Sequence, residues 1–273
     1  MKNLKTKLEE LLATYTGQWG VVICQQGTGE KIEINPEMVF PAASMIKVPI
    51  MYEIMCQVAS GLIDLDGFIT LSKEKRVGGA GILQELRPEI SMTVRELITL
   101  MIILSDNTAT NLLIELVGME AVNQRMQLLG LRSTLLCRKM MDFEAARAGK
   151  ENKTSARDLA LLFHCIQQSE GLPPEYGTLM LDILKRQQVV DKLPFYLPED
   201  RILAHKTGTL PGAEHDGGIL YLPQDSYIIC ILTTDLVENY QGLQLVASMG
   251  KIIYDYFNSR EESLCLIKKP LHC

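Results

Sequence analysis

The segment PAASMIKVPI, residues 41–50, places a serine and a lysine three positions apart within an apolar run. On a helix, positions i and i+3 share a face, so the Ser44 hydroxyl and the Lys47 amine can approach each other. A serine hydroxyl is a poor nucleophile until a base removes its proton, and burial lowers a lysine pKa enough for the amine to be that base. Alone the pattern is weak, because SKEK at 72–75 matches it too and is typical of a solvated surface.

Two more short motifs lie further along the chain. The triplet SDN at 105–107 follows an apolar helical pattern, and KTG at 206–208 ends a segment with strand character. Each has an ordinary interpretation, because Ser, Asp and Asn favour helix ends and glycine favours the turn after a strand. The functional interpretation of the second triplet is a strand that presents a lysine and a hydroxyl, with Gly208 allowing close backbone approach.

The three motifs together are far more informative than any one of them. They occur in the order SxxK, SDN, KTG, with separations of 61 residues from Ser44 to Ser105 and 101 from Ser105 to Lys206. This ordered triple is the signature of class A β-lactamases and penicillin-binding proteins. Over about residues 18–258 the chain resembles that superfamily of serine hydrolases, and it is most similar to class A β-lactamases.

The resemblance implies a role for each matched position. Ser44 is the nucleophile, Lys47 accepts its proton, and Ser105 passes a proton to the leaving nitrogen. The backbone N–H groups of Ser44 and Thr209 form the oxyanion hole, and Lys206 is a second catalytic cation that helps to keep Lys47 neutral. The positions that bind substrate, through its acyl-amide side chain or its carboxylate, are Asn107, Lys206, Thr207, Gly208 and Thr209.

The sequence departs from the family at the glutamate that activates the deacylating water. In class A β-lactamases this glutamate stands two residues after an arginine on a long loop. Counting from Arg138 puts Met140 at that place, and the loop is several residues shorter. Asp142 and Glu144 are nearby carboxylates that could substitute, with Glu144 preferred, or they are ordinary loop acids. The arginine often found on the strand after KTG is also missing, and His215 and Asp216 lie in that vicinity.

Strand patterns occupy both ends of the chain and helical patterns fill the middle. The strand patterns are 19–26, 31–35, 202–208, 217–223 and 226–234, and the helical ones are 3–14, 92–104, 111–116, 121–129, 155–168, 176–186 and 241–258. The apolar helix around Ser44 contains Pro49, which predicts a kink. We therefore predict an α+β fold. Residues 1–43 and 187–273 form an antiparallel sheet flanked by terminal helices, and residues 44–186 form an all-α lobe inserted between them. The site lies in the cleft between the two lobes.

The composition narrows the partners. A chain of 273 residues with 47% hydrophobic content and net charge −6 is typical of a globular protein that does not bind nucleic acid. No apolar run approaches the roughly 18 residues of a membrane span. Seven scattered cysteines form no CxxC and no cluster with metal-ligand spacing. We expect a small-molecule substrate, no cofactor, no metal, no membrane or nucleic-acid partner, and a monomer.

The location and the reaction are predicted with alternatives. Glu9 and Glu10 interrupt any signal-peptide core, and the odd number of thiols fits a reducing compartment, so the sequence as written predicts a cytoplasmic protein, or an extracytoplasmic one if a leader has been removed. The resemblance implies a serine hydrolase that opens β-lactam amides through a Ser44 acyl-enzyme, with slow deacylation if Met140 replaces the glutamate. The alternatives are a peptidase, esterase or amidase for another substrate, or a penicillin-binding sensor that stays acylated.

Overall fold

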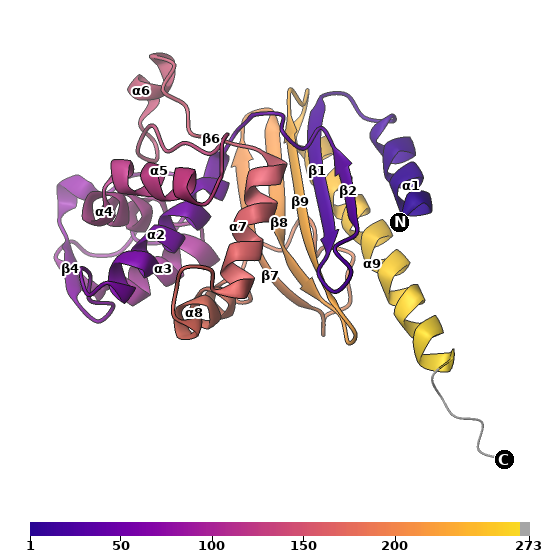
Figure 1. The fold of residues 1–273 in the computed structure, drawn as a ribbon. Helices are drawn as coiled ribbons and strands as arrows, with labels where there is room; N and C mark the ends of the chain where they lie inside the picture. The colour runs from indigo at the N-terminus through magenta and orange to yellow at the C-terminus, as the bar shows by residue number, and fades with distance from the viewer. Residues whose placement is uncertain (268–273) are drawn as a thin grey trace.

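The centre of the molecule is a five-stranded antiparallel sheet with strand order β2-β1-β9-β8-β7 (Figure 1). The computed structural model describes residues 1–267, with side chains as far as Arg260. The strands are β1 (Gln18–Gln25), β2 (Lys31–Ile34), β7 (Ile202–Leu210), β8 (Ala213–Tyr221) and β9 (Ser226–Thr234). The two ends of the chain therefore build one sheet, as predicted.

Helices cover both faces of the sheet (Figure 1). The terminal helices α1 (Lys2–Leu12) and α9 (Asn239–Ile267) lie together on one face, while α7 (Ala156–Gln168) packs against β1 and β9 on the other. The leucines at positions 4, 8 and 12 are buried, because a spacing of four keeps them on one stripe of α1. These contacts confirm the predicted sheet flanked by terminal helices.

A helical lobe stands beside the sheet, with α2 (Lys47–Ala59) at its centre. The first ten residues of α2 are all buried, as expected of a helix that is apolar on nearly every side. The helices around it are α3 (Val94–Ile103), α4 (Asn107–Val117), α5 (Met119–Leu128) and α8 (Pro174–Leu184), and a short helix, α6 (Phe143–Arg147), projects from the lobe (Figure 1). Thr93 caps α3 with Glu96 in a capping box.

Two details of the predicted lobe are wrong. Residues 44–186 are not all helical, because β4 (Phe68–Leu71) pairs with β5 (Ile90–Thr93), and β6 (Lys153–Thr154) pairs with β3 (Phe40–Pro41). Pro49 does not interrupt the interior of a helix, because α2 begins only at Lys47. Pro49 thus falls in the first turn, where no backbone N–H has an intrahelical partner to lose.

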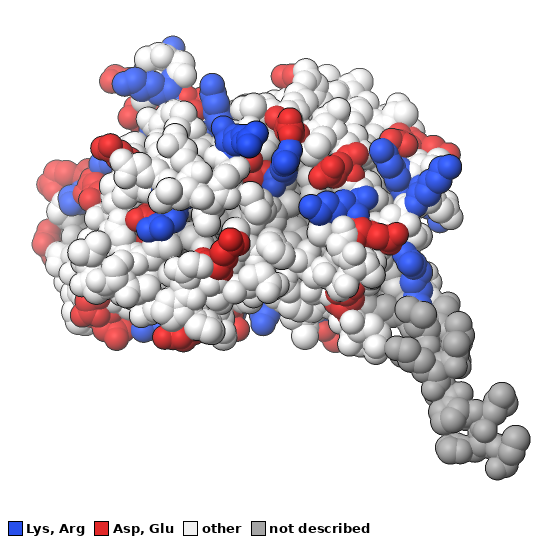
Figure 2. All heavy atoms as spheres, viewed as in Figure 1, with Lys and Arg blue, Asp and Glu red and all other residues white. Residues whose placement is uncertain are grey.

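Basic and acidic side chains are interspersed over the face shown in Figure 2. Among residues 1–267, no helix is long and apolar enough to cross a membrane. Five cysteines are free thiols, Cys24, Cys56, Cys137, Cys165 and Cys230. The side chain of Cys265 and the whole of Cys273 lie outside the described part of the chain.

Candidate active site

Ser44 lies in a short 3-10 helix, η1 (Ala43–Ile46), that leads directly into α2. A 3-10 helix has three residues per turn, so side chains at i and i+3 eclipse, and Ser44 and Lys47 project on the same side. Met45 and Ile46 between them are fully buried and anchor the turn, whereas Ser44 is only half-buried. Within the described side chains, the Ser44 hydroxyl makes no hydrogen bond, so the expected hydrogen bond between this hydroxyl and the Lys47 amine is not formed in this structure.

The surroundings of Lys47 explain why an apolar segment carries a lysine. Its side chain is fully buried, and Nζ donates to the Ser105 carbonyl at 2.6 Å, to Ser105 Oγ at 3.0 Å and to Asn107 Oδ1 at 3.0 Å. Burial and then the positive charge of Lys206 hold the pKa of Lys47 well below its usual value, although Asp106 opposes them. A lowered pKa raises the fraction of the Lys47 amine that is unprotonated and able to accept a proton.

Ser105 connects the two buried lysines of the site. Its Oγ accepts from Lys47 Nζ and also from Lys206 Nζ at 3.1 Å. Lys206 is itself fully buried and donates to the carbonyl of Thr207 at 2.8 Å. Burial and the nearby Lys192 lower the pKa of Lys206 to about 7, against the influence of Asp216. One hydroxyl therefore lies between two amines that can exchange protons through it.

Asp106 explains how the second motif is held in place. Its carboxylate caps α4 by accepting from Ala109 N at 2.8 Å, and its other oxygen accepts from the backbone of Ile82 at 2.7 Å and Leu83 at 2.9 Å. A Cβ on Gly81 would lie 2.2 Å from that carboxylate, so only glycine fits there. The loop before α4 thus becomes a fixed wall of the site.

Gly208 brings the edge strand β7 against η1. A Cβ on Gly208 would lie 3.2 Å from the backbone nitrogen of Ser44 and 3.1 Å from the Cβ of Ala43. The glycine therefore permits a close backbone approach, as predicted, although the segment that approaches is η1. The next residue, Thr209, then lines the same pocket as Ser44. Their backbone N–H groups are thereby neighbours of the position that an oxyanion would occupy, which remains a prediction.

A pocket of about 220 Å³ opens in front of Ser44. Its lining comes from η1, from the segment before β5, from the first residue of α4, from the segment between α5 and β6, and from the end of β7. The lining residues are Ala43, Ser44, Gly79, Ala80, Asn107, Arg138, Met140, Met141, Phe143, Glu151, Asn152, Thr209 and Leu210. Ala43 and Met141 have positive φ of 47° and 62°, and Ser105, which holds the two lysine amines, has 55°. Such backbone conformations are uncommon outside glycine and gather at functional sites.

The comparisons with known proteins agree with this geometry. A family model described as the beta-lactamase enzyme family matches residues 3–257. The chain belongs to this family. It is 25% identical to the extended-spectrum beta-lactamase PER-1 of Pseudomonas aeruginosa over 93% of this chain and 87% of that protein, and 26% identical to a beta-lactamase of Bacillus licheniformis over 94% and 86%.

Solved structures of the family have the same fold as this protein. PBP-A superposes with a TM-score of 0.87 at 29% identity, covering 95% of this chain and 97% of that one, and a mutant of PBP-A has been solved as an acyl-enzyme complex with penicillin-G. A beta-lactamase from Sphaerobacter thermophilus superposes with a TM-score of 0.84 at 30% identity, covering 93% and 96%. The predicted fold class and the predicted family are therefore confirmed.

In this member of the β-lactamase family, Met140 lies in the wall of the pocket. The side chain of Asn111 holds its backbone, because Oδ1 accepts from Met140 N at 2.8 Å and Nδ2 donates to Met140 O at 3.1 Å. The loop around Met140 is closed by Arg138, whose guanidinium pairs with Glu151 at 2.9 Å. A thioether thus stands at the place where the resemblance expects a carboxylate.

The two acids proposed as substitutes do not reach the pocket. Asp142 is exposed and caps α6 by accepting from Ala145 N at 2.9 Å. Glu144 is exposed within α6, which projects away from the lobe (Figure 1). The acid that does line the pocket is Glu151, which sequence reasoning missed, and its carboxylate is occupied by Arg138 and by the backbone N–H of Asn152. The sequence signal for Glu151 was only its position 13 residues after Arg138.

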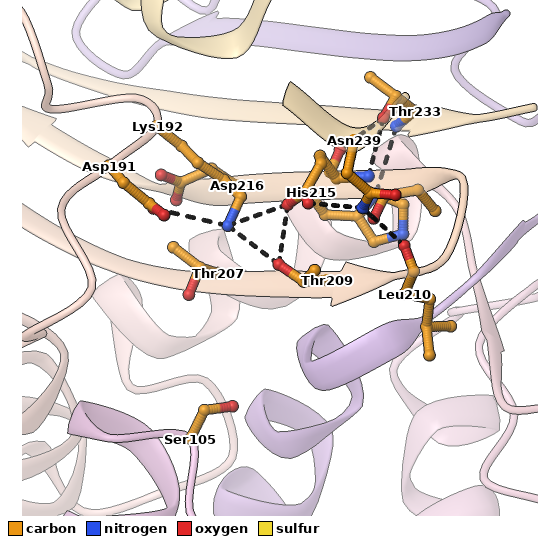
Figure 3. Close-up of polar contacts among 12 residues, drawn as sticks. Ser105, Asp191, Lys192, Thr207, Thr209, Leu210, His215, Asp216, Thr233 and Asn239 are labelled. Carbon is orange, nitrogen blue, oxygen red and sulfur yellow. Dashed lines mark hydrogen bonds and ion pairs between the residues drawn. The ribbon is translucent and has the colours of Figure 1, made fainter. Parts of the chain in front are cut away.

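The residues near the strand position where the family often has an arginine do not include a free cation in the described part of this chain, and the buried cation beside Thr209 is Lys192. His215 is buried and bonds Pro41 O at 2.8 Å, and burial lowers its pKa to about 4, so it is neutral. Asp216 binds His205 at 2.8 Å and the backbone of Leu193 at 3.0 Å. The latter bond positions Lys192, whose buried Nζ donates to Thr209 Oγ1 at 3.2 Å (Figure 3).

Proposed function

We propose that this protein opens β-lactams through an acyl-enzyme on Ser44 and releases the product slowly. The observation that carries the proposal is the pair of buried lysines that converge on Ser105, one of which, Lys47, follows Ser44 by three residues. Two amines with lowered pKa values and a shared hydroxyl provide a path for one proton from the nucleophile to a leaving nitrogen. The names of the relatives, which are beta-lactamases, support the same substrate class.

The acylation step follows from the positions of these groups. Lys47 takes the proton from Ser44, whose Oγ forms a bond to the lactam carbonyl carbon while the N–H groups of Ser44 and Thr209 stabilise the oxyanion. The carbon–nitrogen bond of the ring then breaks, and the nitrogen takes a proton from Ser105. Lys47 returns its proton to Ser105, so each group ends in its starting protonation state. The products are an ester on Ser44 and a free amine.

Deacylation requires a water molecule and a base in the same pocket. Met140 cannot take a proton from water, because a thioether is only a weak acceptor. Glu151 is held in an ion pair with Arg138, and Asp142 and Glu144 are exposed outside the pocket. Loss of a general base typically costs about 10²–10⁴-fold in rate, so the ester on Ser44 accumulates.

Labelling with a fluorescent penicillin tests the proposal. The wild-type protein is expected to take up one label, which digestion places on the peptide that contains Ser44. Ser44→Ala removes the nucleophile, so its labelling should fall to background while its thermal unfolding stays that of the wild type. Label on another residue, or a labelled Ser44→Ala, would exclude this mechanism. Nitrocefin hydrolysis measured in parallel distinguishes an enzyme with turnover from a protein that reacts once.

A further inference from the structure

A buried ion pair lies at the edge of the pocket, next to the residue expected to hold the substrate carboxylate. Glu214 on β8 and Lys192, which precedes β7, are 2% and 1% exposed, and Lys192 Nζ lies 3.1 Å from Glu214 Oε2. Asn239 donates to the other carboxylate oxygen at 2.7 Å. A buried carboxylate with partners on both oxygens is fixed in position.

This pair contacts the pocket through Thr209. Thr209 and Glu214 are directly opposite each other in the β7–β8 ladder, so their side chains lie on the same face of the sheet. The Thr209 hydroxyl donates to Glu214 Oε2 at 2.7 Å and accepts from Lys192 Nζ at 3.2 Å. Thr209 is itself exposed and lines the pocket with Ser44. The ion pair therefore acts on the pocket through a single hydroxyl.

The hydrogen-bond count of Thr209 limits what it can offer a ligand. A threonine hydroxyl has one proton to donate, and that proton is used in the hydrogen bond to Glu214. A substrate carboxylate at Thr209 would meet an oxygen lone pair, with the negative charge of Glu214 behind it. Thr207 differs, because its hydroxyl makes no hydrogen bond with the described side chains and points to the Ser105 side in Figure 3.

The charge of Lys192 is likewise paired with carboxylates of the protein. Its ammonium faces Glu214 at 3.1 Å and Asp191 at 3.6 Å, so two carboxylates surround one cation. The Glu214 carboxylate therefore opposes the attraction of the Lys192 ammonium for an anionic ligand in the pocket. The two carboxylates around Lys192 thus weaken its attraction for an anion in the pocket.

We infer that Glu214 is a specificity-determining residue that replaces a substrate carboxylate with a carboxylate of the protein. Amides or esters that carry no charge beside the scissile bond should then acylate Ser44 at least as fast as their counterparts that carry a carboxylate there. This inference rests on the proposed acyl-enzyme at Ser44. It names the acyl donors that the site accepts, which the geometry of Ser44 and Lys47 leaves open.

Benzylpenicillin and its methyl ester test the inference, because they differ only in the charge of that carboxylate. Second-order acylation constants from intact-mass spectra give the acid-to-ester ratio, which we expect to be about one or less in the wild type. Glu214→Gln keeps the shape and frees the charge of Lys192, so the ratio should rise about tenfold or more, the scale of one charge–charge interaction near a protein surface. Asp191→Asn is the matched control, because that partner of Lys192 is exposed and its effect is screened to about twofold.

A double variant keeps the test decisive if Glu214→Gln folds poorly. Lys192→Met with Glu214→Gln removes both charges and leaves neither buried alone, so the acid-to-ester ratio should stay at the wild-type value. A tenfold fall in that ratio would show that Lys192 already binds the substrate carboxylate and would overturn the inference. An unchanged ratio in a folded Glu214→Gln protein would overturn it too. If neither compound modifies Ser44, the proposed function fails and the inference fails with it.

Discussion

The two sides of the pocket are built differently. On the side of α2 and β7, Lys47 and Lys206 are fully buried on regular elements, and their amines share the hydroxyl of Ser105. On the side of the loop after α5, Met140 faces the pocket and the nearest free acids are exposed. Rigid elements hold reacting groups more accurately than loops do. The comparison shows that forming the ester on Ser44 and hydrolysing it depend on separate parts of the molecule, and that only the first part is complete.

The largest change should come from adding the missing base. Met140→Glu places a carboxylate in the pocket wall, where Asn111 already fixes the backbone. Deacylation should accelerate about 10²–10⁴-fold, the range of general-base catalysis, while acylation changes little. Stopped-flow nitrocefin hydrolysis measures the gain, and Met140→Gln is the matched control without a base. Equal rates for the two variants would mean that the base has to come from another place.

On the other side of the pocket, Lys47→Arg should remove the base for acylation. Arginine keeps a positive charge but does not deprotonate in proteins. Acylation of Ser44 should therefore fall about 10²-fold or more. The time course of fluorescent-penicillin labelling measures it, with thermal unfolding as the control for the larger side chain. Near-normal labelling would show that Lys47 acts only through its charge.

The pH dependence of acylation should identify Lys206. Its pKa is lowered to about 7, so the ammonium is present below that pH and is lost above it. Acylation that uses this cation should fall as the pH rises through 7. Lys206→Arg stays charged, so its alkaline limb should move beyond pH 10. Intact-mass acylation rates from pH 5 to 10 test this, and an unmoved limb would assign it to another group.

The smallest effects belong to the two exposed acids. Asp142→Asn and Glu144→Gln change side chains outside the pocket, so the rate of ester hydrolysis should stay within about twofold of the wild type, as is usual for surface substitutions. Adduct lifetimes from intact-mass spectra decide this. A lifetime prolonged tenfold by either variant would show that the loop moves that carboxylate to the water, and the difference between the two sides would disappear.

Much of the acylation side could be predicted because its signals are local. SxxK, SDN and KTG are each continuous in sequence. The strands at the two ends of the chain carry the β-branched residues that favour a sheet. The elements that were missed depend on contacts between distant segments. Lys192 lies in the irregular segment before β7 and becomes a neighbour of Thr209 only through tethering of Leu193 by Asp216. Its partner Glu214 comes into range only when β7 and β8 pair.

The loop side was harder to predict for a physical reason. Counting two residues from Arg138 predicted Met140 at the pocket, and Met140 does line it. Counting could not show that α6 would carry Glu144 away from the pocket, nor that Glu151 would return to pair with Arg138. The path of a loop is set by such side-chain contacts, which have no periodic pattern in the sequence.

The lifetime of the Ser44 ester tests the central claim most directly. The protein is mixed with benzylpenicillin, excess reagent is removed, and intact-mass spectra are recorded over time. We predict a one-to-one adduct on Ser44 that persists while the wild-type loop is unchanged and disappears quickly in Met140→Glu. Rapid return of the wild-type protein to its free mass, with hydrolysed penicillin formed, would contradict the account, because it would show that the wild-type loop already provides the base.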